Sequence, residues 1–276
     1  METYLEKLIF SDPLRDPVIR QAIRALELPE GSRGLDAGCG TGHHTLLLAE
    51  AVGLGGHVTG LDLSAELVAH ARGLADLSDH SEQVSIRQGN VNELPFDDDE
   101  FDWAWSVDCV GHQTIGEPQS GLRELARVVR PDGQVAILGY SSQMLLPGFP
   151  LLEVRLNATA SAMNFLAEGL RPEDHFQRAL GWFRDAGLTE PTARTVVGTA
   201  QAPLDDGVRR ALISLFGMLW GEMQPKMTRA DRKEYRRLTD QASPDFILDS
   251  PDYYAFFTYS MFEGLVARDL PDAPME

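Results

Sequence analysis

The residues with the clearest chemical pattern form a glycine-rich segment, Gly34 to Gly42, with the sequence GLDAGCGTG. It lies between a strand expected at 33–37 and a helix expected at 43–52. Glycines let the backbone turn sharply and approach a ligand at places where a Cβ would clash. The helix that follows presents its N-terminal amides to the same ligand. The segment therefore predicts a loop that binds a ligand through its backbone, a geometry that many α/β domains share.

Two acidic residues narrow the choice of ligand. Asp36 stands two residues before the first glycine of a G-x-G-x-G run, and Asp62 follows the strand expected at 57–61. At that distance from the loop, a carboxylate can accept hydrogen bonds from both hydroxyls of a ribose. A dinucleotide-binding loop would read G-x-G-x-x-G, but His43 stands where its third glycine would be. The pattern therefore favours a ligand that contains a ribose and is not a dinucleotide.

These residues need a scaffold, and the sequence predicts one in which strands alternate with helices. The expected strands are 33–37, 57–61, 84–88, 101–107 and 134–139, and the expected helices between them are 43–52, 64–77 and 118–129. Such alternation indicates right-handed βαβ units and a mainly parallel sheet. The other expected elements are helices at 13–28, 151–166, 175–186, 205–223 and 228–239 and strands at 192–199 and 253–267.

Four motifs follow one another along this scaffold. They are DAGCGTG at 36–42, GLDLS at 60–64, QGNVNELPFDDDEFDWAWS at 88–106 and RELARVVRPDGQVAIL at 123–138. In this order and at these spacings the chain resembles the class I S-adenosylmethionine-dependent methyltransferases, in particular the small-molecule branch that includes ubiquinone and menaquinone methyltransferases. The resemblance is close over residues 30–140 and looser over 175–268.

The resemblance implies an α/β fold with a Rossmann-like, seven-stranded, mainly parallel sheet whose last strand is antiparallel. It further implies a single methyltransferase domain over residues 1–276, with its core at about 30–140 and 175–268. Helical insertions would form a lid. The lid elements are expected at about 1–28, 141–171 and 204–240.

The resemblance also implies a binding site for S-adenosyl-L-methionine. The residues expected around this cofactor are Asp36, Gly38, Cys39, Gly40, Gly42, Asp62, Leu63, Asn90, Val91 and Ser106. Asp36 would help to hold the amino group, Asp62 would bind the ribose, and Ser106 would lie beside the methionine moiety. Leu63 would flank the adenine, and Asn90 would meet its edge together with Val91. The family usually has Asp at position 90, but either side chain offers an oxygen that can accept from the adenine amino group.

Methyl transfer from a sulfonium is an in-line displacement, in which the protein supplies position and a dry site. A general base helps if the acceptor is a hydroxyl or a protonated amine, whereas alignment suffices for an acidic phenol or an activated carbon. The candidate bases are Asp108 and His112, because open α/β sheets bind ligands beyond the carboxyl ends of their strands. Alternatively, both residues only shape the loop. We expect no metal, and the acidic run at 97–100 is interpreted as a surface turn.

Composition restricts the partners. The chain of 276 residues has a formal net charge of −18, which disfavours nucleic acid and anionic lipid as partners. The most basic stretch, 229–237, is interpreted as a solvated helix face. Cys39 and Cys109 lack the spacing of a metal site or a disulfide framework, which indicates a reducing compartment. There is no signal-peptide pattern and no apolar run of about 18 residues, so we expect a cytoplasmic protein without a membrane partner.

The methyl acceptor is expected to be a small organic molecule. The insertions carry Met144, Phe149, Met163, Phe165, Phe216, Met218, Trp220 and Met223, which suggest an apolar pocket. The stretch 106–109 reads SVDC instead of the (Asn/Asp)-Pro-Pro-(Tyr/Phe) signature of the amino-methylating branch, which lowers the expectation of nitrogen methylation. The alternatives are a protein methyltransferase, a non-catalytic S-adenosylmethionine-binding protein and a nicotinamide-dependent oxidoreductase. The apolar face at 212–223 is compatible with a monomer or a homodimer.

Overall fold

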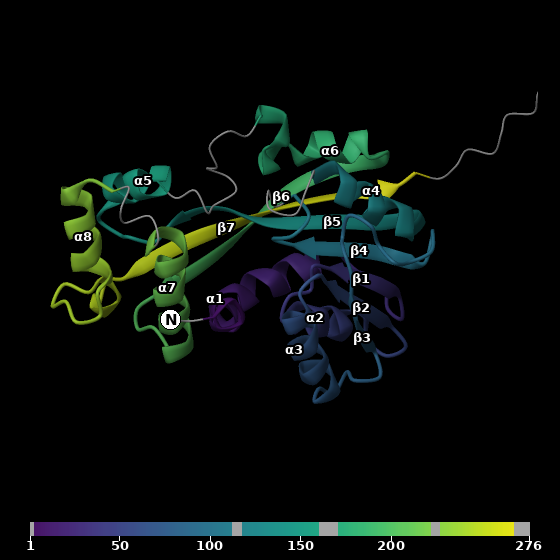
Figure 1. The fold of residues 1–276 in the computed structure, drawn as a ribbon, viewed down its shortest axis with the longest axis horizontal. Coiled ribbons are helices and arrows are strands. Elements are labelled where there is room, and N and C mark those ends of the chain that lie inside the picture. Colours follow the sequence, from purple (N-terminus) through teal and green to yellow (C-terminus); the bar gives the residue numbers. More distant parts are fainter. Residues whose placement is uncertain (1–2, 112–117, 160–170, 222–226, 268–276) are drawn as a thin grey trace, which may run out of the picture. The chain divides into compact units, whose positions relative to one another are not determined.

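The computed structural model describes residues 3–111, 118–159, 171–221 and 227–267. Seven strands form one sheet in the order β3-β2-β1-β4-β5-β7-β6 (Figure 1). The strands are β1 Arg33–Ala37, β2 His57–Asp62, β3 Val84–Gln88, β4 Phe101–Val107, β5 Val129–Met144, β6 Leu188–Gln201 and β7 Tyr254–Val266. β1 to β5 pair in parallel, and β7 runs antiparallel to its neighbours. The expected Rossmann-like sheet with an antiparallel last strand is therefore confirmed.

Eight α-helices accompany the sheet in the described part of the chain. They are α1 Tyr4–Ala25, α2 His43–Val52, α3 Ala65–Asp76, α4 Pro118–Val128, α5 Pro150–Thr159, α6 Ala179–Asp185, α7 Asp206–Phe216 and α8 Arg229–Thr239. Short 3₁₀ turns occur at Pro172–Asp174, Phe176–Arg178 and Ile247–Asp249, and a π-helical turn occurs at Gly217–Gly221. No helix among the described residues is long and apolar enough to cross a membrane.

The chain divides into two compact units. Unit 1 comprises Met1–Gln21, Tyr140–His175 and Thr195–Tyr259, and unit 2 comprises Ala22–Gly139, Phe176–Arg194 and Ser260–Glu276. Strands β1 to β4, with the helices α2, α3 and α4 that connect them, belong wholly to unit 2. The expectation of a single domain with a helical lid concerns the arrangement of the two units, and it stays a prediction.

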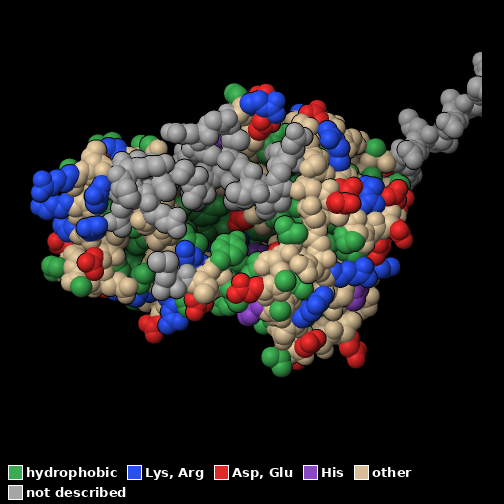
Figure 2. All heavy atoms as spheres, in the orientation of Figure 1, with side chains coloured by type: hydrophobic (Ala, Val, Ile, Leu, Met, Phe, Trp, Pro, Cys, Tyr) green, Lys and Arg blue, Asp and Glu red, His purple; other side chains and the backbone are tan. Residues whose placement is uncertain are grey.

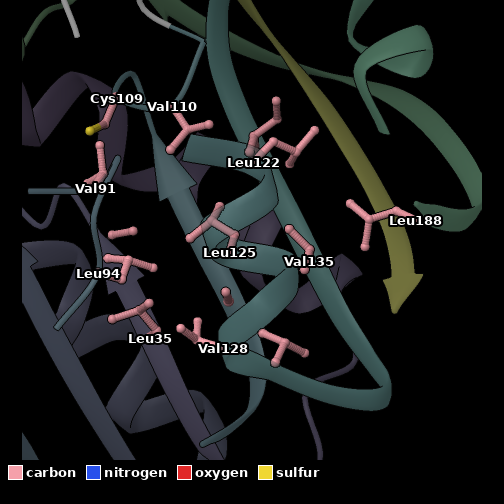
Figure 3. Close-up of a cluster of buried hydrophobic side chains, with 14 of the residues drawn as sticks. Leu35, Val91, Leu94, Cys109, Val110, Leu122, Leu125, Val128, Val135 and Leu188 are labelled. Atoms are coloured by element: carbon pink, nitrogen blue, oxygen red, sulfur yellow. The ribbon is translucent and has the colours of Figure 1, made fainter. Parts of the chain in front are cut away.

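Within unit 2, the two faces of the sheet differ in what covers them. The α4 residues Leu122, Leu125 and Val128 are fully buried and pack with Leu35 and Val135 in one apolar cluster (Figure 3). Their spacing of three residues puts them on one side of the helix. Because successive side chains of a strand alternate between faces, the neighbours of Leu35 in β1 point to the opposite face, towards α2.

The N-terminal helix begins nine residues earlier than the expected start at residue 13. Thr3 and Glu6 form a capping box in which the Glu6 amide donates to Thr3 Oγ1 (3.1 Å) and the Thr3 amide donates to Glu6 Oε2 (2.7 Å). Pro13 and Pro17 therefore lie inside α1, not at its start. The expectation was wrong because it assigned Pro13 to the first turn, where proline is most often found.

Other elements also differ from expectation. The expected helix at 175–186 is a 3₁₀ turn followed by the shorter α6, and the expected helix at 205–223 ends as an α-helix at Phe216. β5 begins at Val129, five residues before the expected start at 134, and continues to Met144, past the expected end at 139. The expected helix at 151–166 extends past α5 into residues outside the described ranges.

The basic stretch on α8 has one solvated side. Arg229, Lys233 and Arg236 are exposed at helical spacing, whereas Tyr235 and Leu238 are buried on the other side. Figure 2 shows the Lys and Arg side chains that gather over this helix. This distribution is the one expected of an amphipathic surface helix.

Candidate functional site

The glycine loop begins where β1 ends. Gly38, Gly40 and Gly42 have φ angles of 83°, 55° and 83°, a region that favours glycine. A Cβ on Gly38 would lie 2.3 Å from Sγ of Cys109, and one on Gly42 would lie 2.8 Å from Cβ of Ala71 in α3. Gly38 and Gly42 are thus required both by their backbone angles and by their close neighbours, and Gly40 is favoured by its backbone angle.

Asp62, at the end of β2, is tied to this loop. Its Oδ2 accepts from the Gly40 amide (3.0 Å), and its Oδ1 accepts from the Ser64 amide (2.9 Å). The Cys39 amide donates to the Leu61 carbonyl oxygen (2.9 Å), which fastens the loop to the same strand. A carboxylate offers about four acceptor positions, so two remain on Asp62 for hydroxyl groups of a ligand. The contacts hold the Asp62 carboxylate in a fixed place and leave part of its hydrogen-bonding capacity for a ligand.

Asp36 lies on the α2 side of β1 and is fully buried. Thr45 Oγ1, in the first turn of α2, donates to Asp36 Oδ2 (2.7 Å). Burial raises the pKa of the Asp36 carboxyl to about 7, the hydrogen bond from Thr45 opposes the shift, and the charge of Asp62 adds to it. A cation placed beside Asp36 would favour its ionised form. This carboxyl therefore suits a positively charged ligand group.

The residues expected to meet the adenine lie after β2 and β3. The side chain of Leu63 is 67% exposed, which leaves an apolar surface open to a flat ring. Asn90 is exposed, and its Oδ1 accepts from the Asn92 amide (3.0 Å). Val91 packs its side chain into the core of unit 2, so that only its backbone can contribute to a ligand site.

The end of β4 and the segment after it are held by the Ser106 hydroxyl and by a backbone contact of Asp108. Ser106 is buried; its hydroxyl donates to the Ala37 carbonyl oxygen (2.7 Å) and accepts from the Val110 amide (3.1 Å). The Asp108 amide donates to the Leu138 carbonyl oxygen (2.8 Å), and Asp108 has a φ of 48°, which is unusual for a residue other than glycine. His112 lies outside the described residues. The roles predicted for these side chains stay predictions.

Two contacts at this site were missed by the sequence reasoning. Thr45 was assigned no role, although it holds Asp36, and Cys109 was not placed against Gly38. Burial raises the pKa of both thiols, that of Cys109 to about 12, so neither Cys39 nor Cys109 is a ready nucleophile. Both contacts depend on packing between elements, for which the chain carries no local motif.

S-adenosylmethionine fits these residues. The glycine loop leaves room for close approach, Asp62 keeps free acceptor positions for a ribose, Leu63 offers an apolar surface, and Asp36 suits a cation. All ten residues expected around the cofactor belong to unit 2.

Comparison with known proteins agrees with this geometry. A family described as "Methyltransferase domain" matches residues 35–133. A demethylmenaquinone methyltransferase of Halalkalibacterium halodurans is 30% identical over 196 residues, which are 66% of this chain and 78% of the relative. One of Listeria welshimeri is 33% identical over 182 residues, 62% of this chain and 75% of the relative. The crystal structure of YcgJ protein from Bacillus subtilis shares the fold, with a TM-score of 0.56, 18% identity, and coverage of 92% of this chain and 99% of that chain.

The fold, the loop and these relatives define the class: the chain is an S-adenosylmethionine-dependent methyltransferase of class I. Within that class it belongs to the menaquinone methyltransferase-like branch. Its cofactor is S-adenosyl-L-methionine, and the product formed from it is S-adenosyl-L-homocysteine.

Proposed function

We propose that this enzyme methylates a small, apolar organic acceptor of the quinol type by in-line displacement. The observation that carries the proposal is the similarity to two relatives named demethylmenaquinone methyltransferase over three quarters or more of their length. When bound, S-adenosylmethionine supplies a methyl group on a positively charged sulfur. The acceptor atom has to lie opposite the sulfur, on the far side of that methyl carbon.

In this proposal the residues of unit 2 bind and orient the cofactor. Asp62 accepts from the ribose hydroxyls and Asp36 faces the amino group. The glycine loop, with Cys39, follows the methionine part towards Ser106. Leu63, Asn90 and Val91 contact the adenine. Asp108 and His112 are the candidate bases that would take a proton from the acceptor.

The first test is a calorimetric titration with S-adenosylhomocysteine and, separately, with NAD. We expect saturable binding of the first ligand only. Asp62→Ala should weaken that binding by about a hundredfold or more, because two hydrogen bonds to a charged group are lost. The matched control is Asp76→Ala, which removes an exposed carboxylate at the end of α3. Equal affinity of wild type and Asp62→Ala would contradict the role of Asp62.

The acceptor class is tested with labelled methyl donor and reduced 1,4-naphthoquinone as probe. Label in the naphthalene ring or on its oxygens would support the proposal. Label in protein from a cell extract, with none in the probe, would favour a protein methyltransferase. Cofactor binding without label in either would favour a non-catalytic binding protein.

The expected cytoplasmic location and the monomeric or dimeric state belong to the same proposal. Light scattering measures the mass in solution and decides between monomer and dimer.

A further inference from the structure

Two tryptophans of β4, Trp103 and Trp105, lie two residues apart and therefore on the same face of the sheet. The indole N–H of Trp103 donates to Ser32 Oγ (2.9 Å). The indole N–H of Trp105 is buried and has no hydrogen-bond partner within the described ranges of the chain. An indole nitrogen is a donor only, and buried donors are nearly always paired. Trp105 thus presents a donor that the fold itself leaves unused.

The position of Trp105 relates this donor to the cofactor loop. Trp105 is the register partner of Asp36 on the neighbouring parallel strand β1. Neighbouring strands lie about 4.8 Å apart, and paired residues of a parallel sheet point to the same face. Asp36 is followed within two residues by Gly38, the first glycine of the loop. The side chains of Trp105 and Asp36 therefore leave neighbouring strands on the same face of the sheet, where the loop begins.

The cofactor carries complementary groups, because its amino-acid end has an ammonium and a carboxylate on one carbon atom. Asp36 suits the ammonium, and a donor-only N–H suits the carboxylate. We propose that the indole N–H of Trp105 donates a hydrogen bond to the carboxylate of the bound cofactor. The inference rests on the role proposed for Asp36 and makes Trp105 a binding residue. Because the surrounding residues bury the Trp105 indole completely, the cofactor carboxylate has to displace the groups that cover this N–H.

The test compares S-adenosylhomocysteine with S-adenosyl-3-thiopropylamine, which is the same molecule without the carboxylate. Trp105→Phe should weaken binding of S-adenosylhomocysteine by about tenfold or more and leave binding of the thiopropylamine unchanged. The matched control is Trp103→Phe, which makes the same change on the same face of β4 where the N–H is already paired. This control should alter neither affinity.

A second measurement uses the wild-type protein and needs no variant to fold. In a ¹⁵N-labelled sample, the indole N–H signal of Trp105 should move downfield with S-adenosylhomocysteine and much less with the thiopropylamine. The signal of Trp103 serves as an internal reference. A Trp105 signal that stays in place at saturating S-adenosylhomocysteine would overturn the inference. If Trp105→Phe lowered the affinities for both ligands equally, that would also overturn the inference. If the wild-type protein bound no S-adenosylhomocysteine at all, that result would instead contradict the cofactor site.

Discussion

At the scale of single residues, Asp36 couples ligand binding to protonation. Burial raises the pKa of its carboxyl to about 7, so below that pH the free protein holds a proton there. An ammonium bound beside Asp36 favours the ionised form and lowers this pKa. Binding of S-adenosylhomocysteine at pH 6 should therefore release a proton. The affinity should rise with pH up to about 7 and level off above it.

Calorimetry at pH 6 and pH 8 in buffers of different ionisation enthalpy measures this release. We expect a net release at pH 6 that nearly vanishes at pH 8. The control is Asp36→Asn, which cannot titrate in this range and should show no release at either pH. The same release in wild type and in Asp36→Asn would assign the proton to another group.

Asn90 offers a second prediction about a single residue. Its oxygen already accepts from the Asn92 amide, so one acceptor position of this oxygen is left for a ligand, fewer than a carboxylate would offer. The adenine amino group is itself a donor and would meet an acceptor more favourably. Asn90→Asp should therefore strengthen S-adenosylhomocysteine binding by about three- to tenfold. A calorimetric titration measures this change, and weaker binding by the variant would place Asn90 away from the amino group.

Some of these residues were predictable from the sequence and others were not. Asp36 and Asp62 could be singled out because their places follow from where β1 and β2 end. Thr45 and Cys109 could not, because their contacts depend on how α2 and the segment after β4 pack against the loop. Likewise, the indole N–H of Trp105 became informative only once the pairing of β4 with β1 was known.

At the scale of elements, Glu153 holds the turn between β5 and α5. Its carboxylate accepts from the amides of Leu145 (2.8 and 2.9 Å) and Leu146 (2.9 Å), all in buried surroundings. Glu153→Ala would leave both amides without this acceptor. We expect the free energy of unfolding to fall by about 2–4 kcal/mol. Urea denaturation measures the change.

The control for this prediction is Glu82→Ala, which removes an exposed carboxylate just before β3. Such surface changes usually alter stability by less than about 0.5 kcal/mol. If both variants were equally stable, the turn after β5 would not depend on Glu153.

Several elements of unit 2 followed the sequence closely, because each is a short segment whose pattern can be read from its own residues. β1, α2, β3 and β4 have the bounds that the pattern predicted. Beyond residue 139 the pattern fails, since β5 continues through polar and half-exposed residues to Met144. At α1, the Thr3–Glu6 capping box was a readable signal that was passed over in favour of Pro13.

At the scale of the whole molecule, the cofactor residues all lie in unit 2. A ligand that binds only the folded state stabilises it by about 2.7 kcal/mol at a concentration of 100 Kd. In amide hydrogen exchange, S-adenosylhomocysteine should give the largest added protection at residues 38–42 and 62–64. Asp62→Ala is the control and should gain little. Protection that is largest in α7 and α8 of unit 1 would place the ligand elsewhere.

The close approach of Cys109 to Gly38 also bears on how this protein can vary. Because Gly38 has no Cβ, the side chain of Cys109 fills the space that a Cβ at position 38 would occupy. A larger residue at either position would collide with the other, and a smaller one at 109 would leave a gap beside the loop. In a library of random variants, the residues that are tolerated at position 109 should depend on the residue at position 38. Substitutions in the loop and in the segment after β4 would then occur together during evolution.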